Sequence, residues 1–233
     1  MKSDRMKLDI LTRKQYKKLC FGMVILFVMA VSVSLCYITG WQMDMESLLV
    51  IEEELEREDA LQWKNALLND MECFPVKEDE TGQETWGYEN GYGEGRSYGG
   101  NRKHEGIDIM PSTSQSGYFS IQSVSDGVVE QIGWLELGGY RIGVRSDSGL
   151  YFYYAHLDSY APGLKKGDKV HAGQILGNMG DTGYGKEGTR GQFVVHLHFG
   201  IYYTEDDEEK SLNPFYLLQY RECGMIEKEG NDV

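Results

Sequence analysis

The sequence has few basic residues beyond its first 18 positions. Over 233 residues, 23 Lys and Arg stand against 37 Asp and Glu, a formal net charge of −14. Residues 1–18 hold seven basic residues and two Asp, a balance of +5, which leaves −19 for the rest of the chain. Nucleic acid is therefore not an expected partner, because affinity for phosphate backbones depends on clustered Lys and Arg.

Cysteine is also scarce, with four residues in the chain. Cys20 and Cys36 fall within an apolar stretch, and Cys73 and Cys223 flank the region that reads as globular. Two cysteines do not establish a disulfide. A bond that closes the domain, free thiols and pairing between chains all stay open.

Charge is absent from residues 19–40, 22 positions that are mostly apolar. About 20 such residues suffice for a helix that crosses a bilayer. No small-residue cleavage site follows Gly40, and the apolar run exceeds that of a typical signal peptide. The sequence thus predicts a cytoplasmic basic tail over 1–18, a retained transmembrane helix over 19–40, and an extracytoplasmic remainder of a single-pass cell-membrane protein.

Glycine and proline are missing from residues 44–72, which are rich in Leu, Glu and Ala and so favour a helix. Glu58, Asp59 and Gln62 interrupt the apolar spacing, so no sustained heptads indicate a coiled coil. We expect an acidic helical stalk over 41–72 that lifts the next domain off the membrane. A partner-binding helix is the alternative.

Short β-like runs separated by glycine-containing turns occupy the chain from His104 to Tyr220, without a repeat at solenoid or propeller spacing. The length suits one core. We therefore expect a single, mainly β domain over 73–220, followed by a C-terminal tail over 221–233. The expected strands lie within residues 118–124, 127–135, 140–146, 150–157 and 193–203.

His196 and His198 stand two apart in the run FVVHLHFGI. Side chains alternate across a strand, so both imidazoles share one face while Val195, Leu197 and Phe199 take the other. Alone the pair is weak support for a site, since five histidines in this length give roughly 0.1 such pairs by chance.

Other candidate ligands accompany the pair. His104 and Asp108 stand four apart, with Gly106 between them leaving room for a cation, and His156 ends an aromatic β-rich run. Three ligands suit a catalytic zinc, which keeps its fourth position open for water. His104, Asp108 and one histidine of the pair make such a set, whereas the H-E-x-x-H helix of many zinc proteases is absent.

The chain resembles the lysostaphin-type, LytM-like zinc endopeptidases, which cut peptide cross-links in bacterial peptidoglycan. The similar stretches, in order, are GGNRKHEGIDI, the DGVV turn, YYAHL, KKGDKVHAGQILG and HLHFG. They cover about half the chain, roughly residues 75–205. The resemblance implies an antiparallel β-sheet forming an open barrel, with a groove walled by loops.

The resemblance also implies roles for particular residues. The ligands of one Zn2+ per domain are expected to be His104, Asp108 and His198. His156 and His196 are expected to stand unligated beside the metal-bound water, where they orient or deprotonate it and stabilise the oxyanion. His171 falls at a variable position and is expected on the surface.

These expectations combine into a membrane-anchored, extracytoplasmic zinc endopeptidase that acts on peptide cross-links or stem peptides of peptidoglycan. The alternative is a non-catalytic or partner-regulated scaffold of the same fold at the cell envelope, for example in sporulation. The expected partners are peptidoglycan peptides, the membrane through residues 19–40, and an envelope protein.

Overall fold

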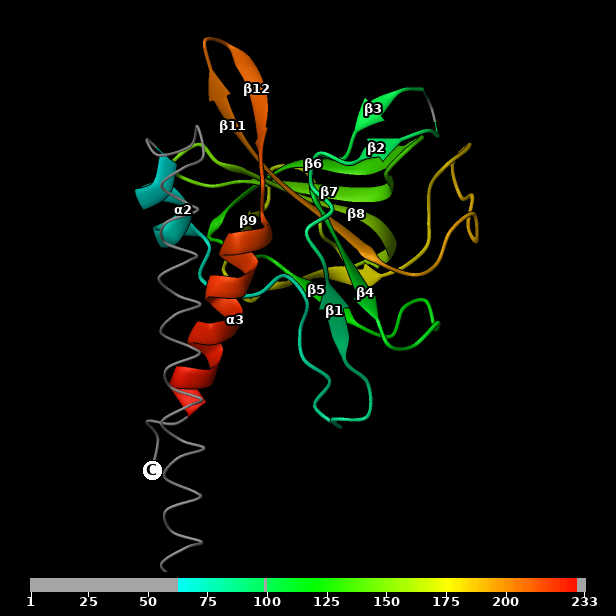
Figure 1. Cartoon of the computed structure of the whole chain (residues 1–233), viewed down its shortest axis with the longest axis horizontal. Coiled ribbons are helices and arrows are strands. Elements are labelled where there is room, and N and C mark those ends of the chain that lie inside the picture. Colours follow the sequence, from blue (N-terminus) through cyan, green and yellow to red (C-terminus); the bar gives the residue numbers. More distant parts are fainter. Residues whose placement is uncertain (1–62, 99, 230–233) are drawn as a thin grey trace, which may run out of the picture. The chain divides into compact units, whose positions relative to one another are not determined.

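The computed structural model describes residues 63–98 and 100–229, all within the second of two compact units of the chain, residues 51–233 (Figure 1). The predicted tail over 1–18, the transmembrane helix over 19–40 and residues 41–62 of the predicted stalk over 41–72 lie outside the described residues. Among the residues described, no helix is both long enough and apolar enough to cross a membrane.

An antiparallel sheet of ten strands forms the body of the domain, and two further strands make a separate hairpin (Figure 1). The strands are β1 (Trp86–Tyr88), β2 (Gly95–Arg96), β3 (Arg102–Lys103), β4 (Ile107–Pro111), β5 (Ser120–Gln122), β6 (Gly127–Leu135), β7 (Gly139–Arg145), β8 (Tyr151–Tyr160), β9 (Lys169–Val170), β10 (Ile175–Met179), β11 (Leu197–Glu205) and β12 (Glu208–Leu212).

The main path of the sheet runs in the order β1-β4-β11-β8-β7-β6-β9. Strand β10 pairs with β5 and β8, β12 pairs with β11, and β2 pairs with β3. The expectation of a mainly β, antiparallel domain is confirmed. The predicted runs over 127–135, 140–146 and 150–157 coincide closely with β6, β7 and β8.

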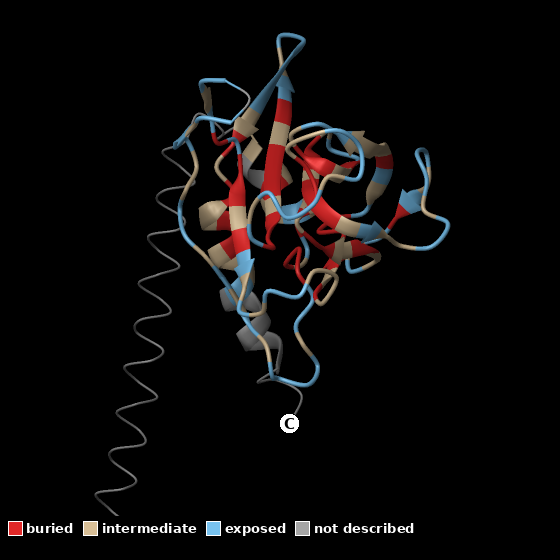
Figure 2. Cartoon of the chain, turned by 90° about the vertical axis from the view of Figure 1, so that its right-hand side faces the viewer, coloured by how far each residue is buried: buried red, intermediate tan, exposed pale blue. Residues whose placement is uncertain are grey.

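The two faces of the central strands differ in character, as a period of two requires. One face carries side chains that are at most 1% exposed, and Figure 2 shows these buried stretches along the central strands. They include Ile107, Ile109, Phe152, Tyr154, Leu197, Phe199 and Ile201. The other face carries Asp108, Tyr153, His198 and Tyr202, which line a pocket.

Two helices, α2 (Lys64–Asp70) and α3 (Phe215–Glu229), contribute to the same core. Leu67 of α2 is buried with Leu217 and Leu218 of α3, and the guanidinium of Arg221 donates to the carbonyl of Leu68. The core thus includes residues placed in the predicted stalk, and α3 continues beyond residue 220. The division of the chain at 73 and 220 stays a prediction.

Cys73 lies just after α2, and its thiol donates to the carbonyl oxygen of Ser123 at 3.2 Å. The side chain of Cys223 lies outside the part of the chain whose side chains are described. A bond between the two cysteines therefore stays untested.

Candidate metal centre

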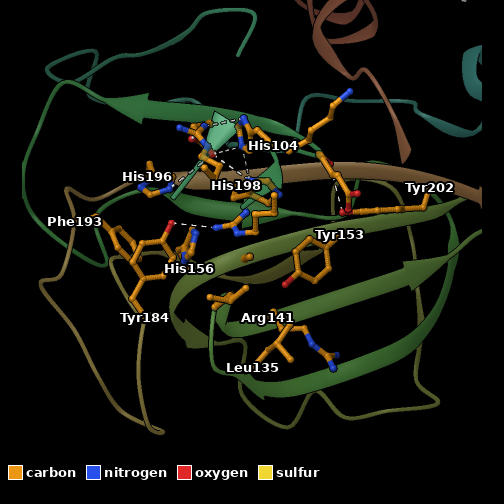
Figure 3. A pocket seen from close by; sticks show the side chains of 18 of the residues that line it. His104, Leu135, Arg141, Tyr153, His156, Tyr184, Phe193, His196, His198 and Tyr202 are labelled. Carbon is orange, nitrogen blue, oxygen red and sulfur yellow. Dashed lines mark hydrogen bonds and ion pairs between the residues drawn. The ribbon is translucent and has the colours of Figure 1, made fainter. Parts of the chain in front are cut away.

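A pocket of about 640 Å³ opens on the polar face of the central strands (Figure 3). All five residues predicted to form the site line it: His104, Asp108, His156, His196 and His198. Strands that are distant in sequence bring them together. The structure therefore places the predicted residues in one cavity, whereas their chemical roles stay predictions.

Sheet pairing positions the three predicted metal ligands. Asp108 on β4 lies directly opposite His198 on β11. His104 precedes β4 in the connection from β3 and is only 2% exposed. The apolar neighbours of Asp108 and His198 point into the core, so burial of those neighbours fixes the strand register that joins the ligands.

The donor atoms of these residues form a nearly equilateral triangle. His104 Nε2 lies 3.0 Å from Asp108 Oδ1 and 2.9 Å from His198 Nδ1, and His198 Nδ1 lies 3.1 Å from Asp108 Oδ1. Tetrahedral zinc with bonds of 2.0–2.1 Å separates neighbouring donors by roughly 3.3 Å. Two imidazole nitrogens and one carboxylate oxygen at this spacing fit a zinc ion that keeps one position open.

The tautomer of His104 suits metal binding. Its Nδ1 lies 2.9 Å from the carbonyl oxygen of Gly91, which can only accept a hydrogen bond, so Nδ1 carries the proton. The lone pair of Nε2 then faces Asp108 and His198. A peptide carbonyl in this outer position is a common support for a metal-binding histidine.

Arg96 on β2 adds a second outer contact. Its Nη2 donates to Asp108 Oδ2 at 2.8 Å, which leaves Oδ1 facing the two histidines. The same nitrogen lies 2.8 Å from His104 Nδ1. Because Nδ1 is occupied by its bond to Gly91, we assign the guanidinium to the carboxylate.

Gly106 lies close to β11. A Cβ at this position would lie 2.5 Å from the carbonyl oxygen of Phe199 and 2.7 Å from Cε1 of His198. The glycine therefore makes room for the β11 backbone and the His198 ring. The room for a cation expected at this position stays a prediction.

The protonation states of the ligands favour a cation. Burial raises the pKa of Asp108, but its side-chain contacts with His104 and His198 outweigh burial and hold the pKa well below its usual range. Burial lowers the pKa of His198, against the opposing effect of Asp108. At neutral pH the triangle thus offers an ionised carboxylate and a neutral His198 imidazole, the forms that bind metal.

A β-bulge directs His156 into the pocket. Tyr140 pairs with Leu157 and Ile142 with Tyr154, so the two residues Ala155 and His156 on β8 oppose the single Arg141 on β7. His156 has a φ of 63°, which is uncommon for a residue with a Cβ. Strict alternation would direct its side chain to the core with Tyr154, and the bulge turns it to the opposite face.

His156 and His196 both present a free Nε2 to the pocket. His156 Nδ1 donates to the carbonyl oxygen of Thr182 and His196 Nδ1 to that of Val194, each at 2.8 Å. Burial is the main cause that lowers the pKa of both imidazoles. Both rings are therefore neutral at pH 7 with a lone pair on Nε2, and His196 Nε2 lies 3.8 Å from Asp108 Oδ1.

Aromatic side chains form one wall beside these imidazoles (Figure 3). Phe193 lies edge-on to His156, with ring centroids 4.5 Å apart, and Tyr184 packs against Phe193 at 4.7 Å. Tyr98 stacks on Tyr184 at 4.1 Å. Tyr92 instead hydrogen-bonds Ser211 and does not line the pocket, whereas Tyr184 does.

His171 lies apart from the site, as predicted, with its side chain 78% exposed. Arg96, Arg141 and Phe193 also line the pocket, and no motif in the sequence had identified them. Side chains alternate along β7, so Arg141 lies on the other face of the sheet from the buried Ile142 and Val144. This alternation predicts that the Arg141 side chain points away from the core, but it does not predict a pocket there.

Comparison with known proteins places this geometry in a family. Residues 102–214 match the model of Peptidase family M23. Over 142 residues the chain is 40% identical to the L-Ala-D-Glu endopeptidase of Bacillus subtilis (strain 168), covering 61% of this chain and 40% of that protein. A glycyl-glycine endopeptidase of Staphylococcus capitis is 35% identical over 118 residues, 48% of this chain and 28% of that protein.

The chain thus spans less than half the length of these two relatives. A solved structure agrees over a larger share: a Ruminococcus gnavus protein, provisionally named a glycyl-glycine endopeptidase, is 48% identical with a TM-score of 0.62, covering 70% of each chain. The stretch that matches the family model, residues 102–214, holds all five predicted site residues. The chain therefore belongs to peptidase family M23.

Proposed function

We propose that the protein is a membrane-anchored, extracytoplasmic zinc endopeptidase that hydrolyses cross-links or stem peptides of bacterial peptidoglycan. The observation that carries the proposal is the triangle of His104 Nε2, Asp108 Oδ1 and His198 Nδ1, with two unligated imidazoles beside it. The two enzymes compared above are named for cleavage at L-Ala-D-Glu and at glycyl-glycine bonds.

His104, Asp108 and His198 would hold a zinc ion, which would supply Lewis-acid chemistry by lowering the pKa of water towards ~7 and polarising the scissile carbonyl. The carboxylate of Asp108 adds a negative charge, so the site favours a divalent cation more than a site of neutral imidazoles alone would. Arg96 and the Gly91 carbonyl hold Asp108 and His104 in the required orientation.

The unligated histidines supply the proton transfers. A neutral imidazole with a free Nε2 accepts a proton from the attacking water as the C–O bond forms. Once protonated, the same Nε2 donates to the oxyanion, or to the amine nitrogen as the C–N bond breaks. The fixed Nδ1 contacts of His156 and His196 keep Nε2 directed at the pocket through both steps.

Anchoring and location rest on the sequence. The basic tail over 1–18 and the uncharged run over 19–40 support an extracytoplasmic domain, where peptidoglycan lies. Cell fractionation tests this part: the full chain should sediment with membranes and a deletion of residues 19–40 should not. A full chain found in the soluble fraction would remove the anchor from the proposal.

A non-catalytic scaffold draws no support from the site. Loss of a ligand would favour that alternative, but His104, Asp108 and His198 are all present and adjacent. An envelope partner that regulates the enzyme is compatible with the proposal, and no specific surface of the described residues favours one.

The decisive experiment uses the full chain purified in detergent. Metal analysis should find one zinc per chain, and incubation with purified peptidoglycan should release new amino groups. His198→Ala should lose both zinc and amine release. His171→Ala is the matched control, because it removes an exposed histidine outside the pocket and should change neither. A zinc-loaded wild-type chain that releases no amine from any wall type would count against the hypothesis.

A further inference from the structure

Arg141 differs from the other arginine on its strand. Gly139, Arg141, Gly143 and Arg145 share the pocket-side face of β7, opposite the buried Ile142 and Val144. Arg145 donates to Glu130 at 2.7 and 3.0 Å and to Glu209 at 3.0 Å. Arg141 makes no ion pair with any residue that the structure describes, and its Nη1 is buried without a hydrogen-bond partner.

A buried guanidinium nitrogen without a hydrogen-bond partner costs free energy. Arg141 lines the pocket and lies on the side opposite His104 and His196 (Figure 3). Its charge reaches the tyrosines of the pocket floor, where it opposes the rise that burial causes in the pKa of Tyr151 and Tyr153. Nothing in the metal chemistry uses this group.

The balance of charge in the pocket points to an anionic ligand. Arg96 is engaged with Asp108, and Glu209 with Arg145. The basic lining residues that remain are Arg102, Lys103 and Arg141, against the single acid Glu105. This cationic surplus stands in a chain of net charge −14, so it is a local feature of the pocket and not a property of the whole surface.

Strand register sets the distance between Arg141 and the metal centre. His198 on β11 lies opposite Ala155 on β8, and the Ala155–His156 bulge lies opposite Arg141 on β7. Two strand spacings of about 4.8 Å place the Arg141 Cα roughly 10 Å from that of His198. An extended peptide covers that distance in about three residues.

We propose that Arg141 forms a carboxylate-binding subsite, so that the enzyme selects peptides with a free carboxylate within about three residues of the scissile bond over neutral peptides such as oligoglycine. The planar guanidinium can bind a carboxylate through two parallel hydrogen bonds. This inference rests on the proposed function, because it assigns the substrate class of the same pocket.

The test uses two synthetic peptidoglycan peptides that differ in one group, a free glutamyl carboxylate or the corresponding carboxamide. With the zinc-loaded full chain, kcat/KM should favour the carboxylate by about 10- to 100-fold. Arg141→Gln should reduce that ratio to about one by slowing cleavage of the acidic peptide alone. Arg190→Gln removes an arginine that does not line the pocket, and should keep the wild-type ratio.

Equilibrium binding separates the subsite from hydrolysis. Fluorescence anisotropy of the same two labelled peptides is measured on chelator-treated protein, with thermal unfolding as a check on each variant. The subsite is supported if the wild-type chain binds the acidic peptide more tightly and Arg141→Gln abolishes this preference. If that result is obtained but neither peptide is cleaved, the proposed peptidase function is wrong while the subsite stands.

Equal cleavage and equal binding of the two peptides by the wild-type chain would overturn the subsite while leaving the peptidase proposal intact. This outcome does not depend on how any variant folds. If Arg141→Gln proves unstable, Arg141→Lys keeps the charge but loses the planar fork, and should retain only part of the preference. An unchanged preference in a folded Arg141→Lys variant would overturn the two-bond recognition.

Discussion

The two faces of the central sheet are built from the same strands, but the side chains on one face are buried and those on the other line the pocket. Phe199 and His198 are neighbours on β11, yet Phe199 is fully buried in the core and His198 faces the pocket. One face supplies the burial that sets strand register, and the other uses that register to bring Asp108 and His198 together. Stability and chemistry are thus separated residue by residue along each strand.

The pocket face itself should divide into ligands and proton carriers, and His196→Ala tests that division. The variant should keep one zinc per chain while kcat falls about 10²- to 10⁴-fold, because a general acid–base group is lost and the donor triangle remains. Metal analysis and amine release measure the two effects. Loss of zinc in this variant would instead make His196 a ligand.

The core face should respond in stability and not in chemistry. Phe199→Ala should lower the free energy of unfolding by about 3–5 kcal/mol, since it leaves a cavity among buried side chains. Urea denaturation measures the change. Thr204→Ala, on an exposed position of the same strand, serves as the control and should stay within about 0.5 kcal/mol of wild type. Similar losses in both variants would contradict the separation of the faces.

Arg96 tests whether the outer contacts belong to the metal site. Arg96→Gln should weaken zinc binding about 10- to 100-fold, because Asp108 loses the group that orients Oδ2. Competition with a chelator of known affinity measures the zinc affinity of each variant. Arg190→Gln removes a different arginine–aspartate pair, with Asp158, and should leave the affinity unchanged.

The smallest expected effect is a pH dependence of the folding stability of the chelator-treated protein. Burial, followed by the influence of His196, lowers the pKa of His156 well below 6.5, so below pH 6.5 the unfolded chain takes up a proton that the folded chain does not. Stability should therefore rise with pH in the window just below 6.5, by at most about 1.4 kcal/mol per pH unit from this residue, and level off above it.

His156→Gln should make that slope shallower without removing it, because the pKa values of His196 and His198 are lowered as well. Urea unfolding at about pH 5.5 and pH 7.5 provides the comparison. An identical slope in the variant would mean that His156 titrates alike in the folded and unfolded chains.

Much of the fold follows from local pattern. Runs such as GVVEQIGWL and LYFYYAHL alternate or stay apolar over strand lengths, and they match β6 and β8. The H-x-x-x-D and H-x-H spacings identified residues that the structure gathers in one pocket. These features are predictable because each depends on residues within a few positions of one another.

Other features depend on contacts between distant segments. His156 reaches the pocket only through a bulge opposite Arg141, and its sequence position alone assigns it to the core face. Gly106 is required by the His198 ring, 92 positions later in the chain. Arg145 has ion-pair partners and Arg141 has none among the described residues, because Glu130 and Glu209 lie beside Arg145. Alternation along β7 does not reveal those positions.

The placement of the pocket over strands β4, β11 and β8 has a consequence for the stereochemistry of a bound peptide. Each of these strands already has a neighbour on both sides, so a peptide over the pocket cannot add to the sheet as a further strand. Recognition must come from side chains and not from a main-chain ladder. Pairing within the sheet therefore places no stereochemical requirement on a bound peptide, and any such selection is left to the side chains that line the pocket.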